Sequence, residues 1–504
     1  MNPSRCDQPR SRTVSVGHPF VAHMNTTRWF VIIASFVVAA QPASVMAQSA
    51  PPAPGAVWQT RDAQSLKQEL GALPDESAKL DSNKTYTLAE LIDVAEMHNP
   101  ETRVAWEEAK SRAAALGIAR SSLYPTISAV AIAVSLRQAA LVGEFFHRQT
   151  EGVFEPVLEV EYLVFDAGGR SGQIDAAKAE LLASNLAFND THRRIIYQVS
   201  SAYYRLLNAE GQRQAAEVSL ENAKTVEEDA KARLANGLAT KPDQLEATAA
   251  RAQAEFDLQA RIGAVDIARG DLATVIGVAP GTEFKVEGID TLKLPSTIAN
   301  SVDQEIDRAF SQRPDLLLQL TRLRAADASM KQARSTYFPA LIFKGNGGEA
   351  RAYGQQDLLP GHYAEGEVWT AELDLRWTLF DGARREYRIA QARADKKAAQ
   401  AEIDALRDQI ANQVWAAYAN MQTALRQQEA AAALLAASQE SYESAHEAYG
   451  YGVRNLLDVV SAQKVLAQAR SEDVSARTQL LLEATNLAFQ TGDLIQVQHW
   501  SPGP

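Results

Sequence analysis

The strongest constraint on the fold of this chain is a tandem repeat with a spacing of 214 to 215 residues. Pro100 and Pro125 recur 214 positions later as Pro314 and Pro339. Anchors spaced by 215 pair Phe165-Asp166 with Phe380-Asp381, Ala202-Tyr203 with Ala417-Tyr418, Gly237 with Gly452, Asp243 with Asp458 and Gly277 with Gly492. Chance matches do not keep register over roughly 180 residues. We therefore expect one structural unit to occur twice, with a single inserted residue in the second hairpin region.

Each repeat predicts the same elements in the same order. A short helix over 88–97 or 304–312 ends before a proline, because the residue that precedes proline avoids helical backbone. A longer helix then runs to about Arg120 or Arg334. Two strands separated by a glycine-bearing loop follow, and then a very long helix, a glycine turn and a shorter return helix.

The predicted strands have a residue pattern that bears on whether they lie in a membrane. Apolar and polar residues alternate over 373–379 and, almost as strictly, over 158–164. This period predicts a sheet with one apolar face, which fits either lipid or the core of a soluble sheet. One hairpin per repeat gives four strands per chain, which cannot close a barrel, and open strand edges cannot lie in lipid. A spanning barrel therefore needs several chains, and three chains of four strands would supply twelve.

The long helices need partners along their whole length. No proline or glycine occurs in the 66 residues from Arg384 to Tyr449. A helix of that length extends over roughly 100 Å and must lie against other helices in a coiled-coil-like arrangement. The copy over 170–236 has the same character, although Gly172 and Gly211 are expected to interrupt it.

The ends and the connection between the repeats define the remaining segments. Residues 1–47 read as a leader whose signal peptide begins at Met24, the expected true start, and the single cysteine, Cys6, lies within it. We expect a flexible extension over 48–86, a first repeat over 87–277, a linker over 278–301, a second repeat over 302–492 and a tail over 493–504. The apolar run of the leader is too short to span a bilayer.

Composition and motifs exclude several classes of function. The net charge of −12 argues against nucleic-acid binding, which needs a basic surface to neutralise phosphates. The sequence contains no zinc-protease motif, nucleophile elbow, phosphate-binding loop or Cys/His cluster. We therefore expect no enzyme activity, no cofactor and no metal site.

Three motifs resemble the TolC-type outer-membrane efflux family. The most specific is Tyr449-Gly450-Tyr451-Gly452-Val453-Arg454-Asn455-Leu456-Leu457-Asp458-Val459-Val460, with a first-repeat counterpart at 237–243. The others are Phe165-Asp166-Ala167-Gly168 and Phe380-Asp381-Gly382-Ala383, each before a long helix. The resemblance covers about 87–492. It implies a mainly α fold with a small β component: a homotrimer with a twelve-stranded outer-membrane β-barrel, four strands per chain, continued by a coiled-coil periplasmic tunnel.

The resemblance also implies a gate at the periplasmic end of the tunnel. By position, Tyr449 and Arg454 would tie the second-repeat helices to the first repeat and to a neighbouring chain, with Asp243 as an acceptor. Asp458, present three times in a trimer, would form an acidic ring at the entrance. Ser461 stands where some members carry a second acidic ring, which predicts weaker block by cations.

The expected function is that of an outer-membrane exit duct in a Gram-negative bacterium. The implied partners are a periplasmic membrane-fusion adaptor, an inner-membrane RND or ABC transporter and outer-membrane lipid. The cargo is either small molecules, such as drugs and toxic compounds, or secreted proteins. The alternative is a soluble periplasmic coiled-coil scaffold, which would explain the helices but not two amphipathic hairpins at matched positions.

Overall fold

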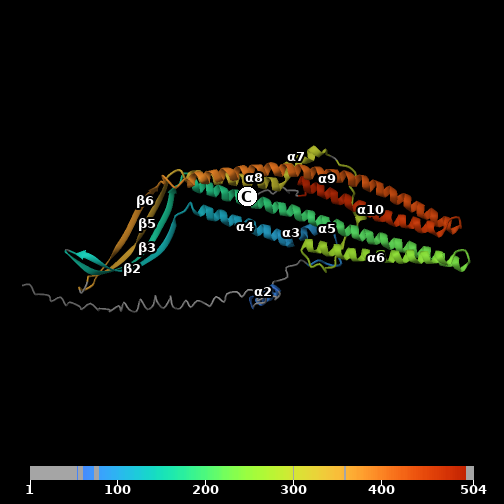
Figure 1. The fold of residues 1–504 in the computed structure, drawn as a ribbon, viewed down its shortest axis with the longest axis horizontal. Coiled ribbons are helices and arrows are strands. Elements are labelled where there is room, and N and C mark those ends of the chain that lie inside the picture. Colours follow the sequence, from blue (N-terminus) through green and yellow to red (C-terminus); the bar gives the residue numbers. More distant parts are fainter. Residues whose placement is uncertain are drawn as a thin grey trace, which may run out of the picture. The chain divides into compact units, whose positions relative to one another are not determined.

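The computed structural model (Figure 1) describes residue 54 and residues 61–72, 79–142, 144–298, 300–356 and 359–494. The expected leader, and all but the first two residues of the expected tail, lie outside these ranges. Contacts divide the chain into residues 1–75 and 76–504. In the first unit the structure describes a helix, α2 (Arg61–Gly71), within the stretch expected to be a flexible extension.

The second unit contains both repeats, and their elements follow the predicted order. The first repeat comprises α3 (Leu88–His98), α4 (Pro100–Ser121), β2 (Thr126–Val142), β3 (Phe145–Phe165), α5 (Gly169–Ala235) and α6 (Lys241–Ile276). The second comprises α7 (Val302–Gln312), α8 (Pro314–Ser335), β5 (Ala340–Gln356), β6 (His362–Arg376), α9 (Arg384–Gly450) and α10 (Leu456–Thr491). Every element of one repeat thus has a counterpart in the other.

Strands and helices of the second unit are arranged in the same lateral order. The four long strands form one antiparallel sheet in the order β2-β3-β5-β6. The helices attached to them pack in the matching order α4-α5-α8-α9, with α6 against α5, and α10 against α5 and α9. The sheet lies at one end of the helices, and the turns that join α5 to α6 and α9 to α10 lie at the other (Figure 1). Within each series, the two outermost elements have a neighbour on one side only. These elements are β2 and β6 in the sheet, and α4 and α9 among the helices.

The short helices begin and end where their sequences direct. Thr87 with Glu90, and Ser301 with Gln304, form capping boxes that satisfy the first backbone N–H groups of α3 and α7. Both helices end two residues before the proline that opens the next helix, with a single residue between them. Arg313 lies between α7 and α8, and its guanidinium donates a hydrogen bond to the Gln490 carbonyl. Asn99 lies between α3 and α4, and its side-chain amide donates to a backbone carbonyl in the last turn of α6.

The expected interruption of the first long helix is wrong. Helix α5 is continuous, and neither Gly172 nor Gly211 has a left-handed backbone. Instead, each glycine allows another helix to come close. A Cβ on Gly172 would lie 2.8 Å from the Gln332 nitrogen of α8, and one on Gly211 would lie 2.6 Å from Val474 of α10. Both glycines therefore serve packing between the repeats, which the pattern within one helix does not reveal.

The strand expected over 373–379 ends earlier, at Arg376. Beyond it, the carbonyls of Thr378 and Leu379 accept hydrogen bonds from Arg385 at 2.7 and 3.1 Å, so they are satisfied without a ladder. Arg385 in turn pairs with Asp381 at 3.2 Å. The turn then passes through Gly382 and Ala383, both at positive φ, before α9 begins. The first-repeat turn uses the same device, with Arg170 donating to the Val164 carbonyl.

The largest hydrophobic core lies where the segment before the first repeat meets the connection between the repeats. Strand β1 (Thr85–Tyr86) pairs in parallel with β4 (Lys285–Val286), and a 3-10 turn follows over Ile289–Thr291. Tyr86 and Phe284 are buried with residues of α3, α5 and α6, including the fully buried Tyr203. Side chains of the connection between Val278 and Leu294 are therefore part of the packed core.

Candidate functional site

The four-stranded sheet has two chemically different faces. Directly opposed residues of an antiparallel pair project to the same side, and side chains alternate along each strand. The register therefore gathers apolar residues on one face: Ile127, Ala129, Ala131 and Ala133 of β2, Leu158, Val160 and Tyr162 of β3, Leu341 and Phe343 of β5, and Trp369, Leu373 and Leu375 of β6. Several of these large side chains are exposed, including Ile127, Leu158, Trp369, Leu373 and Leu375.

The opposite face carries charged residues of β3, β5 and β6, and β2 adds the apolar side chains of Ile132, Val134 and Leu136 to it. The register aligns Glu161 with Lys344, and Lys344 with Glu372. Asp374 on the same face contacts Lys344 at 3.7 Å and Arg376 at 2.9 Å. A sheet with exposed apolar side chains on one face and charged side chains from three strands on the other fits a boundary between hydrocarbon and water. In the part of the chain that the structure describes, no strand pairs with the outer edge of β2 or of β6, and lipid does not tolerate such free edges.

The opposite end of the molecule holds two equivalent turns. The turn after α5 contains Gly237 with φ +70°, and the turn after α9 contains Gly452 with φ +75°. Thr240 caps α6 and forms a capping box with Asp243, whereas the Asn455 side chain caps α10 by accepting from the Asp458 N–H at 2.9 Å. Between the turns, buried side chains from α5, α6, α9 and α10 form one apolar cluster: Val226, Ala230, Ala247, Tyr442, Tyr449, Leu456, Val459 and Leu466. The two repeats are thus packed together at this end.

Tyr449 lies in that cluster with only 6% of its surface exposed. The guanidinium of Arg233, from the first repeat, stacks 4.4 Å from the centre of its ring and donates to the Gly450 carbonyl at 2.5 Å. Burial raises the pKa of the Tyr449 hydroxyl, an effect that the neighbouring Arg233 partly offsets. One turn earlier in α9, His446 lies 3.7 Å from Asp229 of α5. Arg233 therefore connects the last turn of α5 directly to the last turn of α9.

The other predicted site residues, Arg454, Asp458 and Asp243, lie at the two turns and do not contact Tyr449. Arg454 and Asp458 form an ion pair at 3.7 Å within the second turn, and both are exposed. The Asp243 carboxylate accepts from the Thr240 hydroxyl at 2.7 Å and from its N–H at 2.8 Å. These bonds hold the pKa of Asp243 below its usual value. Within one chain, then, Asp243 stabilises the start of its own helix.

Sequence reasoning missed Arg233. It is one of many charged residues in a long helix, four positions before Gly237, and no motif distinguishes it. Glu227, one and a half turns earlier, lies in a similarly charged stretch of the helix but is buried. Its carboxylate accepts from Thr248 at 2.7 Å and pairs with Lys231 and Arg251 at 3.0 Å. These contacts, the Thr248 hydrogen bond above all, lower the pKa of Glu227 and join α5 to α6.

A family model for outer membrane efflux proteins matches residues 91–278 and 306–493, one match in each repeat. The chain belongs to the outer membrane efflux protein family. This match confirms the resemblance inferred from the turn motifs. The chain is an export channel protein of the outer membrane of Gram-negative bacteria. A soluble scaffold is not favoured by this membership.

Individual relatives cover most of the chain. It is 29% identical over 423 residues to the protein CyaE of Bordetella pertussis, covering 81% of this chain and 84% of that protein. It is 26% identical to the outer membrane protein OprJ of Pseudomonas aeruginosa, covering 75% and 78%. Among solved structures, a Pseudomonas aeruginosa membrane protein shares the fold with a TM-score of 0.71 at 23% identity, over 84% of this chain and 97% of that one. The CmeC outer membrane channel of Campylobacter jejuni does so with a TM-score of 0.68 at 18% identity, over 88% and 94%.

Two further observations bear on the site. Among the described residues, no group of His, Cys, Asp or Glu side chains is arranged to hold a metal ion. None of the described helices combines the length and the apolar composition that a membrane-spanning helix requires.

Proposed function

We propose that three copies of this chain close into one channel, with a twelve-stranded barrel in the outer membrane and a helical tunnel below it. The observation that carries this proposal is the four-stranded sheet with an exposed apolar face and two free edges. Pairing β6 of one copy with β2 of the next removes every edge after three copies, because three chains of four strands give an even-numbered closed barrel. The matching order of helices lets the same seam continue along α9 and α4.

The repeat supports the seam at the level of single residues. The contact of α5 with α8 inside one chain corresponds, by the 214 and 215 offsets, to a contact of α9 with α4 of a second copy. Gly172 lies against α8 and corresponds to Tyr387 on α9, which is 74% exposed. Gln332, the residue that Gly172 approaches, corresponds to Ile118 on α4, which is also 74% exposed. Large apolar side chains are thus exposed at both matched positions. Such exposure fits a surface that another copy covers.

The turns at the far end form the gate of the proposed channel. Tyr449 and Arg233 hold α9 against α5 within one chain, and we assign the exposed Arg454 and Asp243 to contacts between copies. Asp458, exposed on the first turn of α10, recurs three times and forms the acidic entrance ring. A lock built from stacked and charge-assisted contacts is directional and can be undone by modest competing contacts.

The channel works without catalysis as the exit piece of a tripartite system. A periplasmic adaptor and an inner-membrane transporter of the RND or ABC type supply the other two parts and open the gate. Two relatives indicate the range of cargo: one is named a toluene efflux pump outer membrane protein and another an antibiotic efflux pump outer membrane protein. The cargo of this chain is accordingly small molecules or, in the secretion branch, proteins.

Membrane fractionation and electrophoresis test this function. Full-length protein expressed in a Gram-negative host is expected in the outer-membrane fraction as a trimer that resists SDS until it is heated. The purified trimer is expected to form channels in planar bilayers. A chain that stays in the soluble periplasmic fraction, or that migrates as a monomer before heating, contradicts the proposal.

A further inference from the structure

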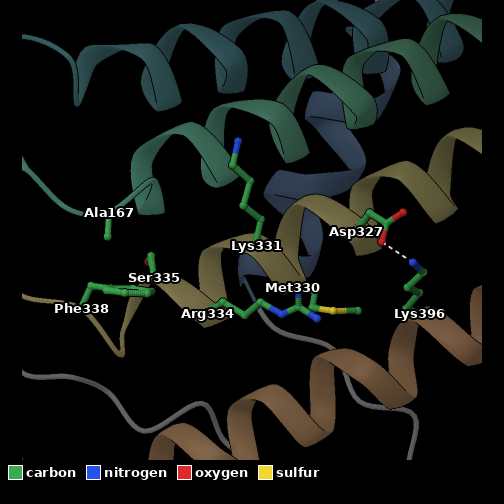
Figure 2. Close-up of a pocket in the computed structure, with 8 residues that line it drawn as sticks. All are labelled: Ala167, Asp327, Met330, Lys331, Arg334, Ser335, Phe338 and Lys396. Carbon is green, nitrogen blue, oxygen red and sulfur yellow. Dashed lines mark ion pairs between the residues drawn. The ribbon is translucent and has the colours of Figure 1, made fainter.

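A cavity of about 330 Å³ lies along one face of α8, between that helix and α9 (Figure 2). Its lining includes Asp327, Met330, Lys331 and Arg334 of α8, Phe338 just after α8 and Lys396 of α9. The volume is at the lower end of the range for ligand pockets, so it suits a compact polar group with a short apolar neighbour.

The lining carries an excess of positive charge. The lining holds three cations, Lys331, Arg334 and Lys396, and one carboxylate, Asp327, although the Lys331 side chain points away from Asp327 (Figure 2). Lys396 is held by Asp327 at 2.6 Å, the contact that Figure 2 marks with a dashed line. Lys331 reaches across to α5, where it contacts Ser171 at 2.5 Å and Asp175 at 3.2 Å. Arg334 forms no ion pair with any residue that the structure describes, so its planar guanidinium is available to an anion.

The fold does not require this charged cavity, because the first repeat fills the equivalent place with an apolar core. There, Leu116, Ala119 and Ile174 are buried together, with Leu181 packed against them. Leu181 corresponds to Lys396 by the 215 offset, and Gly117 corresponds to Lys331 by the 214 offset. Two lining residues recur in the first copy: Arg334 matches Arg120, and Ser335 matches Ser121. Two lysines and a cavity therefore distinguish the second repeat from the first.

The cavity lies where the helices give way to the sheet. Phe338 stands two residues before β5 and is 60% exposed, and the apolar face of the sheet begins at Leu341. Aromatic side chains and snorkelling cations at the border of an apolar surface are typical of the interface between lipid and water. An anion bound beside Arg334 could thus extend an attached acyl chain toward the apolar face.

We propose that this cavity binds a phosphate group, with Arg334 as the principal ligand and Lys331 and Lys396 as supporting charges. The phosphate belongs either to an anionic phospholipid or to free inorganic phosphate, which share the same recognition chemistry. A guanidinium can donate two parallel hydrogen bonds to phosphate oxygens, and each ammonium adds a point charge. The lipid source rests on the membrane role proposed for the sheet, whereas phosphate binding itself does not.

Native mass spectrometry of the purified full-length protein in detergent tests the site. Delipidated protein is titrated in separate samples with phosphatidylglycerol, with phosphatidylcholine and with inorganic phosphate. Arg334→Gln is the test variant, and Arg120→Gln is the matched control, since it removes the equivalent charge beside the packed apolar residues Leu116, Ala119 and Ile174. Loss of a charge-assisted pair predicts roughly tenfold weaker binding of the phosphate probe by Arg334→Gln and wild-type binding by Arg120→Gln.

The titrations distinguish an anionic lipid from free phosphate, and they distinguish failure of this site from failure of the proposed function. Selective retention of phosphatidylglycerol assigns the site to an anionic lipid, and retention of inorganic phosphate without retention of phosphatidylglycerol assigns it to the free ion. The proposal is overturned if wild-type protein retains neither probe, if Arg334→Gln binds like wild type, or if both variants lose binding equally. Channel conductance is recorded on the same preparations. Normal channels without phosphate binding refute this site alone, whereas a preparation that forms no channels refutes the proposed function.

Discussion

Removal of the Arg233 guanidinium should loosen the end of the helical bundle. In Arg233→Gln, the stacking contact with Tyr449 and the hydrogen bond to the Gly450 carbonyl are lost together. Stacking of a cation on an aromatic ring contributes roughly 0.5–1 kcal/mol at a partly exposed site. A hydrogen bond from a charged donor contributes about 1.5–3 kcal/mol. Because Arg233 is partly exposed, we take the low end of both ranges, about 2 kcal/mol for each chain.

This loss translates into a measurable change in gating. In a single chain, a change of about 2 kcal/mol shifts the equilibrium between the clamped and released forms roughly 30-fold, and the proposed channel contains three such chains. Single-channel recording in planar bilayers should therefore show Arg233→Gln open far more often than wild type at the same voltage. Arg233→Lys keeps the charge but not the planar stacking surface, so its open probability should lie between the two.

Arg213 provides a matched control. It lies on the same helix, and its guanidinium pairs with Glu217 of that helix. Arg213→Gln removes an equal charge without touching the second repeat and should gate like wild type. If Arg233→Gln has the closed-state conductance and open probability of wild type, the reasoning about the clamp between α5 and α9 is refuted. Equal effects of both variants would show that net charge, not the contact, matters.

Three further changes probe other parts of the account. Arg454→Ser combined with Tyr449→Phe should give a leakier channel in planar bilayers, and an unchanged closed-state conductance would sink the assignment of both residues to the gate. Gly172→Ala should lower the melting temperature, because an added Cβ would lie 2.8 Å from a backbone nitrogen of α8. Overpacking of this kind costs about 1–3 kcal/mol, and a wild-type melting curve would contradict that close approach. Glu227 has a lowered pKa in the folded chain, so its contribution to stability is present above the ordinary glutamate range and is lost as pH falls through the folded value. Melting temperatures measured from pH 7 down to pH 3 should therefore fall less steeply in Glu227→Gln than in wild type, and parallel curves would refute its role.

The repeat made most of the architecture predictable from sequence. Proline and glycine positions marked the helix ends, and the capping residues beside them make the same boundaries physically necessary. The alternation over 158–164 identified a strand that the structure extends in both directions, to Phe145–Phe165. Local signals of this kind are encoded by adjacent residues, which is why one sequence suffices to read them.

Features that depend on contacts between distant helices could not be read in this way. Gly172 and Gly211 looked like weak points of a helix, and only the positions of α8 and α10 show that they permit close packing. The end of β6 was misplaced because Arg385 satisfies the carbonyls that follow it. The turn motifs led to Tyr449, Arg454, Asp243 and Asp458, yet the clamp on Tyr449 comes from Arg233, over 200 positions earlier in the chain.

The central claim is that identical chains close the sheet by pairing β6 of one copy with β2 of the next. Within the chain, Val160 of β3 is paired with Gly345 of β5. The repeat offsets convert this pair to Leu375 of one copy opposite Ala131 of the next. A protein carrying Leu375→Cys and Ala131→Cys tests that register directly, and Leu375→Cys with Ile132→Cys is the control, because one step along a strand moves a side chain to the other face.

Oxidation in intact outer membranes followed by denaturing electrophoresis gives the answer. The account predicts covalent dimers and trimers, and nothing larger, for the Leu375/Ala131 pair and little cross-linking for the Leu375/Ile132 pair. Absence of cross-links in the first protein, equal cross-linking in both, or a ladder that continues beyond the trimer would contradict closure of the barrel by three copies.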